Sequence, residues 1–322
     1  MLHVSGSYWT AVGRESSNWI AMTAYNASSR FAVPAFMMLS GAFLLETKKE
    51  PDIKGVLARF GKLLMNLYMW SAFYAFQGIA VKLILRGNTE GLWSDSWQRF
   101  LWGHYHMWFV FPILGFYLLL PILQKICENK VVIEYFLWLW LLTAFIIPIA
   151  ASFLKLDWIN TWIYKLNILI GYPGYFLLGY YLKKYPLSKK IQIPVYIGGV
   201  VGFLYIVTGT ILQSYIQDIY CDSFFSPGSW NVFLYVTAIF TFFANRNEMN
   251  FGYSLVRKTA RYSFVIYMVH PFFLEKLNMM GITTISFSSL FSVPVLTFLI
   301  FICSYAVAAV IHRIPYLNKW IL

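Results

Sequence analysis

The stretch from Tyr25 to Leu45, YNASSRFAVPAFMMLSGAFLL, joins an apolar second half to a first half with two serines, an asparagine and an arginine. The second half is apolar enough for a helix that crosses a lipid bilayer. Arg30 lies inside this stretch, although burying an arginine in a span costs about 2.5–3.5 kcal/mol on insertion scales. Pro34 has no amide hydrogen to donate to the Arg30 carbonyl. We therefore predict a helix kinked at Arg30, with the guanidinium facing the interior of a helical bundle.

The composition indicates an integral membrane protein. Of the 322 residues, 59% are hydrophobic and only 12% are charged, with a mean hydropathy of +0.61. A soluble domain of this length would need more charge on its surface, so that class is excluded. Aromatic residues make up 20% of the chain, which is typical of rings at membrane–water interfaces. The three cysteines have no CxxC spacing, so we expect neither a disulfide framework nor a zinc site.

A membrane-spanning helix needs about 20 mostly apolar residues, and the chain has nine such segments. We expect a single domain over residues 1–322, an all-α polytopic helical bundle. The predicted spans cover 19–45, 57–85, 104–124, 131–154, 162–182, 191–213, 230–245, 261–278 and 288–311.

The distribution of lysine and arginine predicts the orientation. Most of the 25 basic residues lie in one set of alternate loops, which the positive-inside rule places in the cytoplasm together with the C-terminus. The net charge of +12 is then a topology signal, and we expect no nucleic-acid partner. An odd number of spans leaves the N-terminus outside. We expect that MLHV at the start is the stub of a tenth, truncated first helix.

Histidines and other polar side chains inside the spans are the candidates for chemistry. Ser263, Tyr267, His270 and Leu274 are spaced 4, 3 and 4 and therefore share one helix face. Pro271 removes the hydrogen bond to the Tyr267 carbonyl, which loosens the backbone beside His270. A single histidine of this kind is more often a packed, hydrogen-bonded residue than a catalytic one. The similar depth of several histidines and Arg30 favours a functional site.

No metal site is expected. His104 and His106 are two residues apart on an expected helix, so they should point to different sides, and no carboxylate lies near them in the sequence. The segment HYHMW is equally consistent with an interfacial aromatic belt. The Walker A, GxGxxG, HExxH and GxSxG motifs are absent. The basic loops ETKKEPDIKG and VRKTAR are suited to a phosphorylated cytoplasmic ligand, although such loops are more often topology signals.

Four segments, in order, resemble membrane acyltransferase family 3. SSRFAVPAFMMLSGAFLL is similar to its arginine–valine–proline and serine–glycine signature, and HYHMWFVFPILGFYLLLPIL to its histidine–x–tryptophan–phenylalanine span. GYPGYFLLGYYL is similar to its phenylalanine–leucine–leucine–glycine span, and YSFVIYMVHPFFL to its histidine–proline span. The resemblance covers nearly the whole chain and is nearest to the branch of the enterobacterial common antigen O-acetyltransferase.

The resemblance implies ten helices that transfer an acyl group, usually acetyl from cytoplasmic acetyl-CoA, to a hydroxyl of an envelope polysaccharide or glycolipid. It makes His3 the catalytic histidine, although the basic residue expected about ten positions earlier has no counterpart. Arg30 is expected to be the second catalytic residue, serving either the reaction itself or the anionic part of the coenzyme. The substrate cavity is expected to contain His106, Trp108, Tyr267 and His270. Four basic residues are expected around the coenzyme phosphates: Lys48, Lys49, Arg257 and Lys258.

Acetyl-CoA is then a co-substrate, no cofactor is tightly bound, and the protein contacts membrane lipids in the cytoplasmic membrane. Two other interpretations stay open. A glycolipid transporter or flippase would also contain kinked helices and buried charge, although it predicts internal repeats that are not visible. The other is a truncated, non-catalytic membrane subunit. Substitution of His3 separates them, because it should abolish transfer only in the enzyme.

Overall fold

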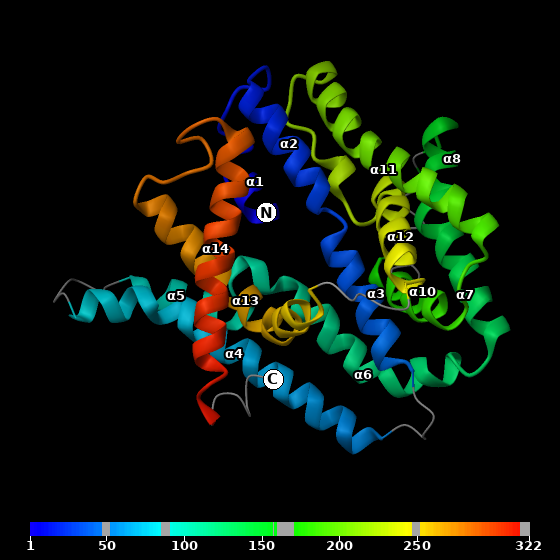
Figure 1. Ribbon diagram of the computed structural model, residues 1–322, viewed down its shortest axis with the longest axis horizontal. Helices are drawn as coiled ribbons and strands as arrows, with labels where there is room; N and C mark the ends of the chain where they lie inside the picture. Colours follow the sequence, from blue (N-terminus) through cyan, green and yellow to red (C-terminus); the bar gives the residue numbers. More distant parts are fainter. Residues whose placement is uncertain (47–51, 85–90, 157, 160–170, 247–251, 316–322) are drawn as a thin grey trace. The chain divides into compact units, whose positions relative to one another are not determined.

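A computed structural model describes residues 1–46, 52–84, 91–156, 158–159, 171–246 and 252–315. Within these ranges every regular element is helical, which confirms the predicted all-α class. The elements, drawn in Figure 1, are α1 (Leu2–Gly6), α2 (Ser17–Ser29), α3 (Ala32–Leu44), α4 (Ile53–Ile84), α5 (Leu92–Trp102), η1 (Tyr105–Phe109), α6 (Val110–Ile126), α7 (Lys130–Leu141), η2 (Leu142–Ile146), α8 (Ile147–Phe153), α10 (Tyr172–Lys184), α11 (Lys189–Ile216), η4 (Ser223–Phe225), α12 (Trp230–Ala244), α13 (Tyr253–Met279) and α14 (Ser289–Ile311).

Seven helical stretches among the described residues are long and apolar enough to cross a membrane. They overlap seven of the nine predicted spans. The third of these stretches begins at Leu92 instead of residue 104, because α5 precedes η1 and α6. The prediction for 162–182 lies partly outside the described residues, and its second half forms α10. The prediction for 261–278 falls within α13, which carries charged residues near both ends.

Apolar side chains cover the outside of the helices, as expected for contact with lipid. On α14 an exposed row consists of Phe291, Val295, Phe298 and Ile302, whose spacings of 4, 3 and 4 put them on one helix face. Their exposed fractions lie between 47% and 64%. An exposed apolar row of this length is unfavourable in water and suits the hydrocarbon core of a bilayer.

The described helices divide into two compact units. Unit 1 comprises residues 1–48, 122–251 and 277–299, and unit 2 comprises residues 49–121, 252–276 and 300–322. The prediction of one domain over 1–322 stays a prediction. In unit 1, α3 packs along α10 and α11 along α12 (Figure 1). Gly198 and Gly202 of α11 face α12, where Gly202 lies against the backbone of Asn231.

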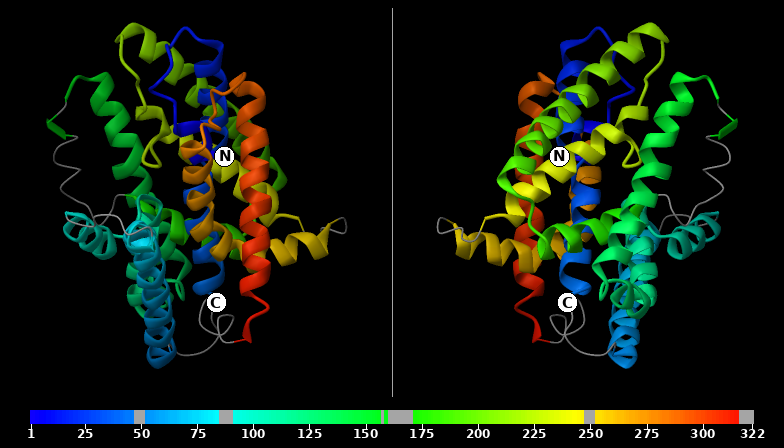
Figure 2. Two further views of the ribbon diagram at one scale, coloured as in Figure 1. Left: turned by 90° about the vertical axis from the view of Figure 1, so that its left-hand side faces the viewer. Right: turned by 90° about the vertical axis from the view of Figure 1, so that its right-hand side faces the viewer.

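Unit 2 is held together by aromatic contacts and by buried hydrogen bonds such as that of Tyr74. The Tyr74 hydroxyl on α4 donates to the Met268 carbonyl on α13 at 2.6 Å. The rings of Phe73 and Phe272 join the same two helices, with centroids 5.7 Å apart. Figure 2 shows that α13 is bent, its gold first part running across its orange second part. A proline inside the helix, Pro271, is a usual cause of such a bend.

The predicted kink at Arg30 is present as a break between α2 and α3 (Figure 1). The Arg30 amide donates to the Ala27 carbonyl at 3.1 Å, so the last turn of α2 tightens to an i to i−3 bond. The hydroxyls of Ser28 and Ser29 both donate to the Tyr25 carbonyl, at 2.8 and 3.0 Å. Serine bonds of this kind bend helices, and they add to the effect of Pro34.

Candidate functional site

Arg30 lies at the break between α2 and α3, inside unit 1. Its guanidinium lies over the Phe225 ring, 4.2 Å from the centroid. Asp222, three residues before Phe225, attracts the guanidinium electrostatically. Nε is buried, and no described residue accepts a hydrogen bond from it. The guanidinium is held against the Phe225 ring, and its buried Nε–H has no acceptor among the described residues. Such a group is suited to binding an anion.

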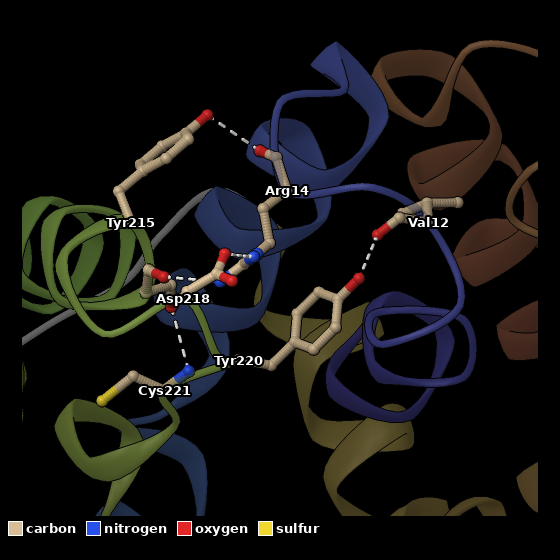
Figure 3. Close-up of polar contacts among 7 residues, drawn as sticks. Val12, Arg14, Tyr215, Asp218, Tyr220 and Cys221 are labelled. Carbon is tan, nitrogen blue, oxygen red and sulfur yellow. Dashed lines mark hydrogen bonds and ion pairs between the residues drawn. The ribbon is translucent and has the colours of Figure 1, made fainter.

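Arg14, Tyr215, Asp218 and Tyr220 form a polar clamp at the loop after α11 (Figure 3). Asp222 and Phe225 follow directly in the sequence. Arg14 forms an ion pair with Asp218 and donates a second hydrogen bond to the Ser214 carbonyl at 2.8 Å. The Tyr215 hydroxyl donates to the Arg14 carbonyl at 3.0 Å, and the Tyr220 hydroxyl to the Val12 carbonyl at 2.7 Å. The clamp therefore fastens the loop after α1 to the loop after α11.

The Trp9 ring connects this clamp to the arginine. Its centroid lies 5.6 Å from that of Phe225 and 5.6 Å from that of Tyr220. The Trp9 indole donates to the Thr23 hydroxyl of α2 at 2.9 Å. Phe225 is 3% exposed, so the surface under Arg30 is a packed part of unit 1.

His3 lies on α1, which packs antiparallel against α2. At one end of the contact the Ser28 hydroxyl lies 3.7 Å from the Met1 sulfur, and at the other Trp9 bonds to Thr23. The His3 carbonyl accepts a hydrogen bond from Ser7 at 2.7 Å. His3 therefore belongs to the same unit as Arg30 and lies beside the part of α2 that ends at the break.

In unit 2, the structure corrects the expectation that His104 and His106 point apart. Their Nδ1 atoms are 2.9 Å from each other. The expected α-helix does not begin at His104. Gly103 has φ of +76°, His104 is extended and η1 follows, so the chain turns the two rings towards each other.

Glu275, which the sequence analysis did not single out, brings a carboxylate to these histidines from a distant part of the chain. Its Oε1 lies 3.0 Å from His104 Nε2. The Tyr74 ring stacks on His104, with centroids 4.2 Å apart and an angle of 17° between the planes. Glu275 is about 170 positions from His104 in the sequence, so only tertiary packing brings them together.

Tyr267 and His270 of the predicted helix face meet His106. The Tyr267 hydroxyl donates to the His106 carbonyl, and the rings of His106 and His270 have centroids 5.6 Å apart. His270 Nδ1 lies 2.6 Å from the Tyr267 carbonyl, which is the carbonyl that Pro271 leaves without its helical donor. A carbonyl only accepts, so Nδ1 of His270 carries the proton. Trp108, in η1, is 46% exposed.

The predicted coenzyme-phosphate residues are only partly described. Lys48 and Lys49 lie outside the described residues. Arg257 and Lys258 are exposed on the first turns of α13, where they line a surface hollow of about 490 Å³ with Tyr253, Ser254 and Arg261. Within the described ranges, no three histidine, cysteine, aspartate or glutamate side chains are arranged to hold a metal ion.

Residues 1–313 match a family model described as an acyltransferase domain, of acyltransferase family 3. No curated protein matches the chain. No solved structure matches it either.

Proposed function

Because the chain belongs to acyltransferase family 3 and is a membrane acyltransferase, we propose that it is an O-acetyltransferase. Its donor is cytoplasmic acetyl-CoA, and its acceptor is a hydroxyl of an envelope polysaccharide or lipid-linked sugar, as in the enterobacterial common antigen branch. The protein works in the cytoplasmic membrane, with its C-terminus in the cytoplasm. Acetyl-CoA is a co-substrate, and no cofactor is tightly bound.

The observation that carries this proposal is the placement of Arg30. The guanidinium lies at a helix break inside a span, over Phe225, with Nε buried and no described side chain accepting from it. Polar donors fixed in a low-dielectric site stabilise the negative charge that develops when a hydroxyl attacks a thioester carbonyl. Arg30 is suited either to this oxyanion or to an anionic part of the coenzyme.

His3 is the proposed general base, since an imidazole takes up a proton near neutral pH and can remove it from the attacking hydroxyl. The four residues of unit 2 assigned to the substrate cavity are His106, Trp108, Tyr267 and His270. Arg257 and Lys258 are proposed to meet the coenzyme phosphates, because the hollow that they line also contains a third cation, Arg261, and the Ser254 hydroxyl. Lys48 and Lys49 are proposed for the same role.

The test uses membranes that contain the protein and radiolabelled acetyl-CoA, and it counts alkali-labile label in the glycan and glycolipid fraction. His3→Ala and Arg30→Ala should each abolish the label. The matched controls are His312→Ala and Arg99→Ala; Arg99 is exposed on α5, and neither residue has a role in the proposal. Equal label in Arg30→Ala and Arg99→Ala would overturn the assignment of Arg30. No label from correctly inserted wild-type protein would favour the transporter or subunit interpretations.

A further inference from the structure

Three side chains of unit 2 form a continuous hydrogen-bonded chain that becomes more buried at each step. The Glu275 side chain is 38% exposed, that of His104 is 13% exposed, and His106 is 0% exposed. Glu275 Oε1 lies 3.0 Å from His104 Nε2, and His104 Nδ1 lies 2.9 Å from His106 Nδ1. Both distances are within hydrogen-bonding range.

The donors and acceptors in this chain can be assigned. A carboxylate only accepts, so His104 Nε2 carries a proton and donates it to Glu275. In a neutral His104 ring, Nδ1 then accepts, and His106 Nδ1 donates to it. His106 therefore carries its lone pair on Nε2. Each ring has one nitrogen that donates and one that accepts, which is the arrangement that passes a proton from one end to the other.

Aromatic side chains hold the two rings in place. Tyr74 stacks on His104, and Tyr105 lies 4.5 Å from it between centroids. Tyr267 and His270 flank His106 at 5.3 and 5.6 Å. The outer end of the chain differs, because Glu275 lies in the last turns of α13, next to the exposed Lys276. The Glu275 side chain, at 38% exposed, is the outer end of the chain.

We propose that Glu275, His104 and His106 form a proton relay between the substrate cavity and solvent. The proposal rests on the proposed function, because acylation of a hydroxyl breaks an O–H bond inside a buried site. A proton that reaches His106 Nε2 lets its Nδ1 proton pass to His104. The Nε2 proton of His104 then passes to Glu275, which releases it to water.

This outward passage leaves both rings in the opposite tautomer, and an inward passage restores them. The inward passage delivers one proton from water to His106 Nε2 at the proposed substrate cavity of unit 2, and one proton is what the departing thiolate takes up. One outward and one inward passage therefore add up to the balanced reaction, in which the hydroxyl loses one proton and the thiol gains one. Glu275 and His104 act through His106 and are positioning residues, whereas His106 lies in the proposed cavity.

The decisive variant is Glu275→Gln, which keeps the shape of the side chain and removes its ability to accept and release a proton. We expect acetyl transfer to slow at least about ten-fold, since positioned proton transfer contributes about 10²–10⁴-fold. Added imidazole buffer should restore part of the rate, because a mobile base can replace a missing relay. Glu128→Gln is the matched control, since Glu128 is an exposed glutamate paired with Lys125. It should neither slow transfer nor respond to imidazole.

A second measurement needs no activity. In protein labelled with ¹⁵N-histidine in detergent, the exchange of the His106 ring proton with water should slow at least ten-fold in Glu275→Gln. His106→Asn assigns the signal. Loss of activity without rescue by imidazole would indicate a structural role and overturn the relay, as would an unchanged exchange rate. If wild-type protein transfers no acetyl group, the proposed function fails, and the exchange rate alone decides whether the chain conducts protons.

Discussion

Substitution of Gly41 by alanine should destabilise unit 1, because α3 and α10 cross there with their backbones in contact. A Cβ at Gly41 would overlap the Phe176 carbonyl, and a Cβ at Gly179 would overlap the Met38 carbonyl. Each glycine therefore faces the backbone of the opposite helix. A backbone carbonyl cannot rotate away as a side chain can, so the helices must separate.

The size of the effect follows from this geometry. Heavy atoms need about 3.5 Å between them, so α3 and α10 must move apart along their contact. A gap of only about 0.5–1 Å already removes about a quarter to a half of the dispersion energy of each atom pair that it opens, and the overlap with the Phe176 carbonyl requires a larger separation. Overpacking a core costs about 1–3 kcal/mol. Because the obstacle is backbone on a long helix contact, we expect a loss in the upper part of that range, about 2–3 kcal/mol.

The assay is thermal denaturation of the purified protein in a mild detergent, followed by the loss of helical circular dichroism. The controls are Gly61→Ala in α4 and Gly115→Ala in α6, where an added Cβ meets nothing within 4 Å. Alanine in a helix interior is favoured over glycine by about 0.8–1.0 kcal/mol, so these variants should be as stable as wild type or more stable. If Gly41→Ala denatures at the same temperature as Gly61→Ala, the backbones of α3 and α10 are not in contact at Gly41.

Three further predictions each concern one residue or one residue pair. Burial raises the pKa of the Cys127 thiol to about 12, so roughly one thiol in ten thousand is ionised at pH 8. Maleimide should therefore label Cys127 only after denaturation, and prompt labelling of the folded protein would contradict this. Tyr74→Phe should lower the free energy of unfolding by about 0.5–1.5 kcal/mol, since it removes the bond to the Met268 carbonyl, and unchanged thermal stability would argue against that bond. The Asp218 side chain is 89% exposed, so its ion pair with Arg14 should contribute little to stability. A double-mutant cycle of Arg14→Ala and Asp218→Asn should give a coupling free energy of unfolding of at most about 1 kcal/mol. A coupling above about 2 kcal/mol would show that the pair is shielded from solvent.

The membrane spans and the helix break at Arg30 could be predicted from the sequence, because both depend on residues that are close together in the chain. Length and hydropathy suffice for most spans, because a bilayer sets the number of apolar residues that a helix needs. The break at Arg30 follows from the missing amide hydrogen of Pro34, and the same reasoning at Pro271 identified the Tyr267 carbonyl, which His270 meets at 2.6 Å. Proline acts on its own helix, so its effect can be read without a tertiary structure.

The histidine chain could not be predicted, because it depends on packing and on one backbone angle. His104 and His106 were expected on an α-helix, where a spacing of two sends side chains apart. The positive φ of Gly103 and the η1 turn reverse that relation. Glu275 reaches His104 only through the packing of α13 in unit 2, and Phe225 reaches Arg30 only through the loop after α11. Neither pair is visible in the spacing of the residues.

We propose above that this membrane protein transfers an acetyl group from acetyl-CoA to a sugar hydroxyl. The most direct test places purified protein in vesicles of envelope lipid extract, adds radiolabelled acetyl-CoA outside, and follows ester-linked label in the glycolipid fraction with time. We expect label that accumulates with wild-type protein and stays at background with Arg30→Ala. Label that remains in acetyl-CoA, or that appears only as free acetate, with the protein inserted and folded, would contradict it.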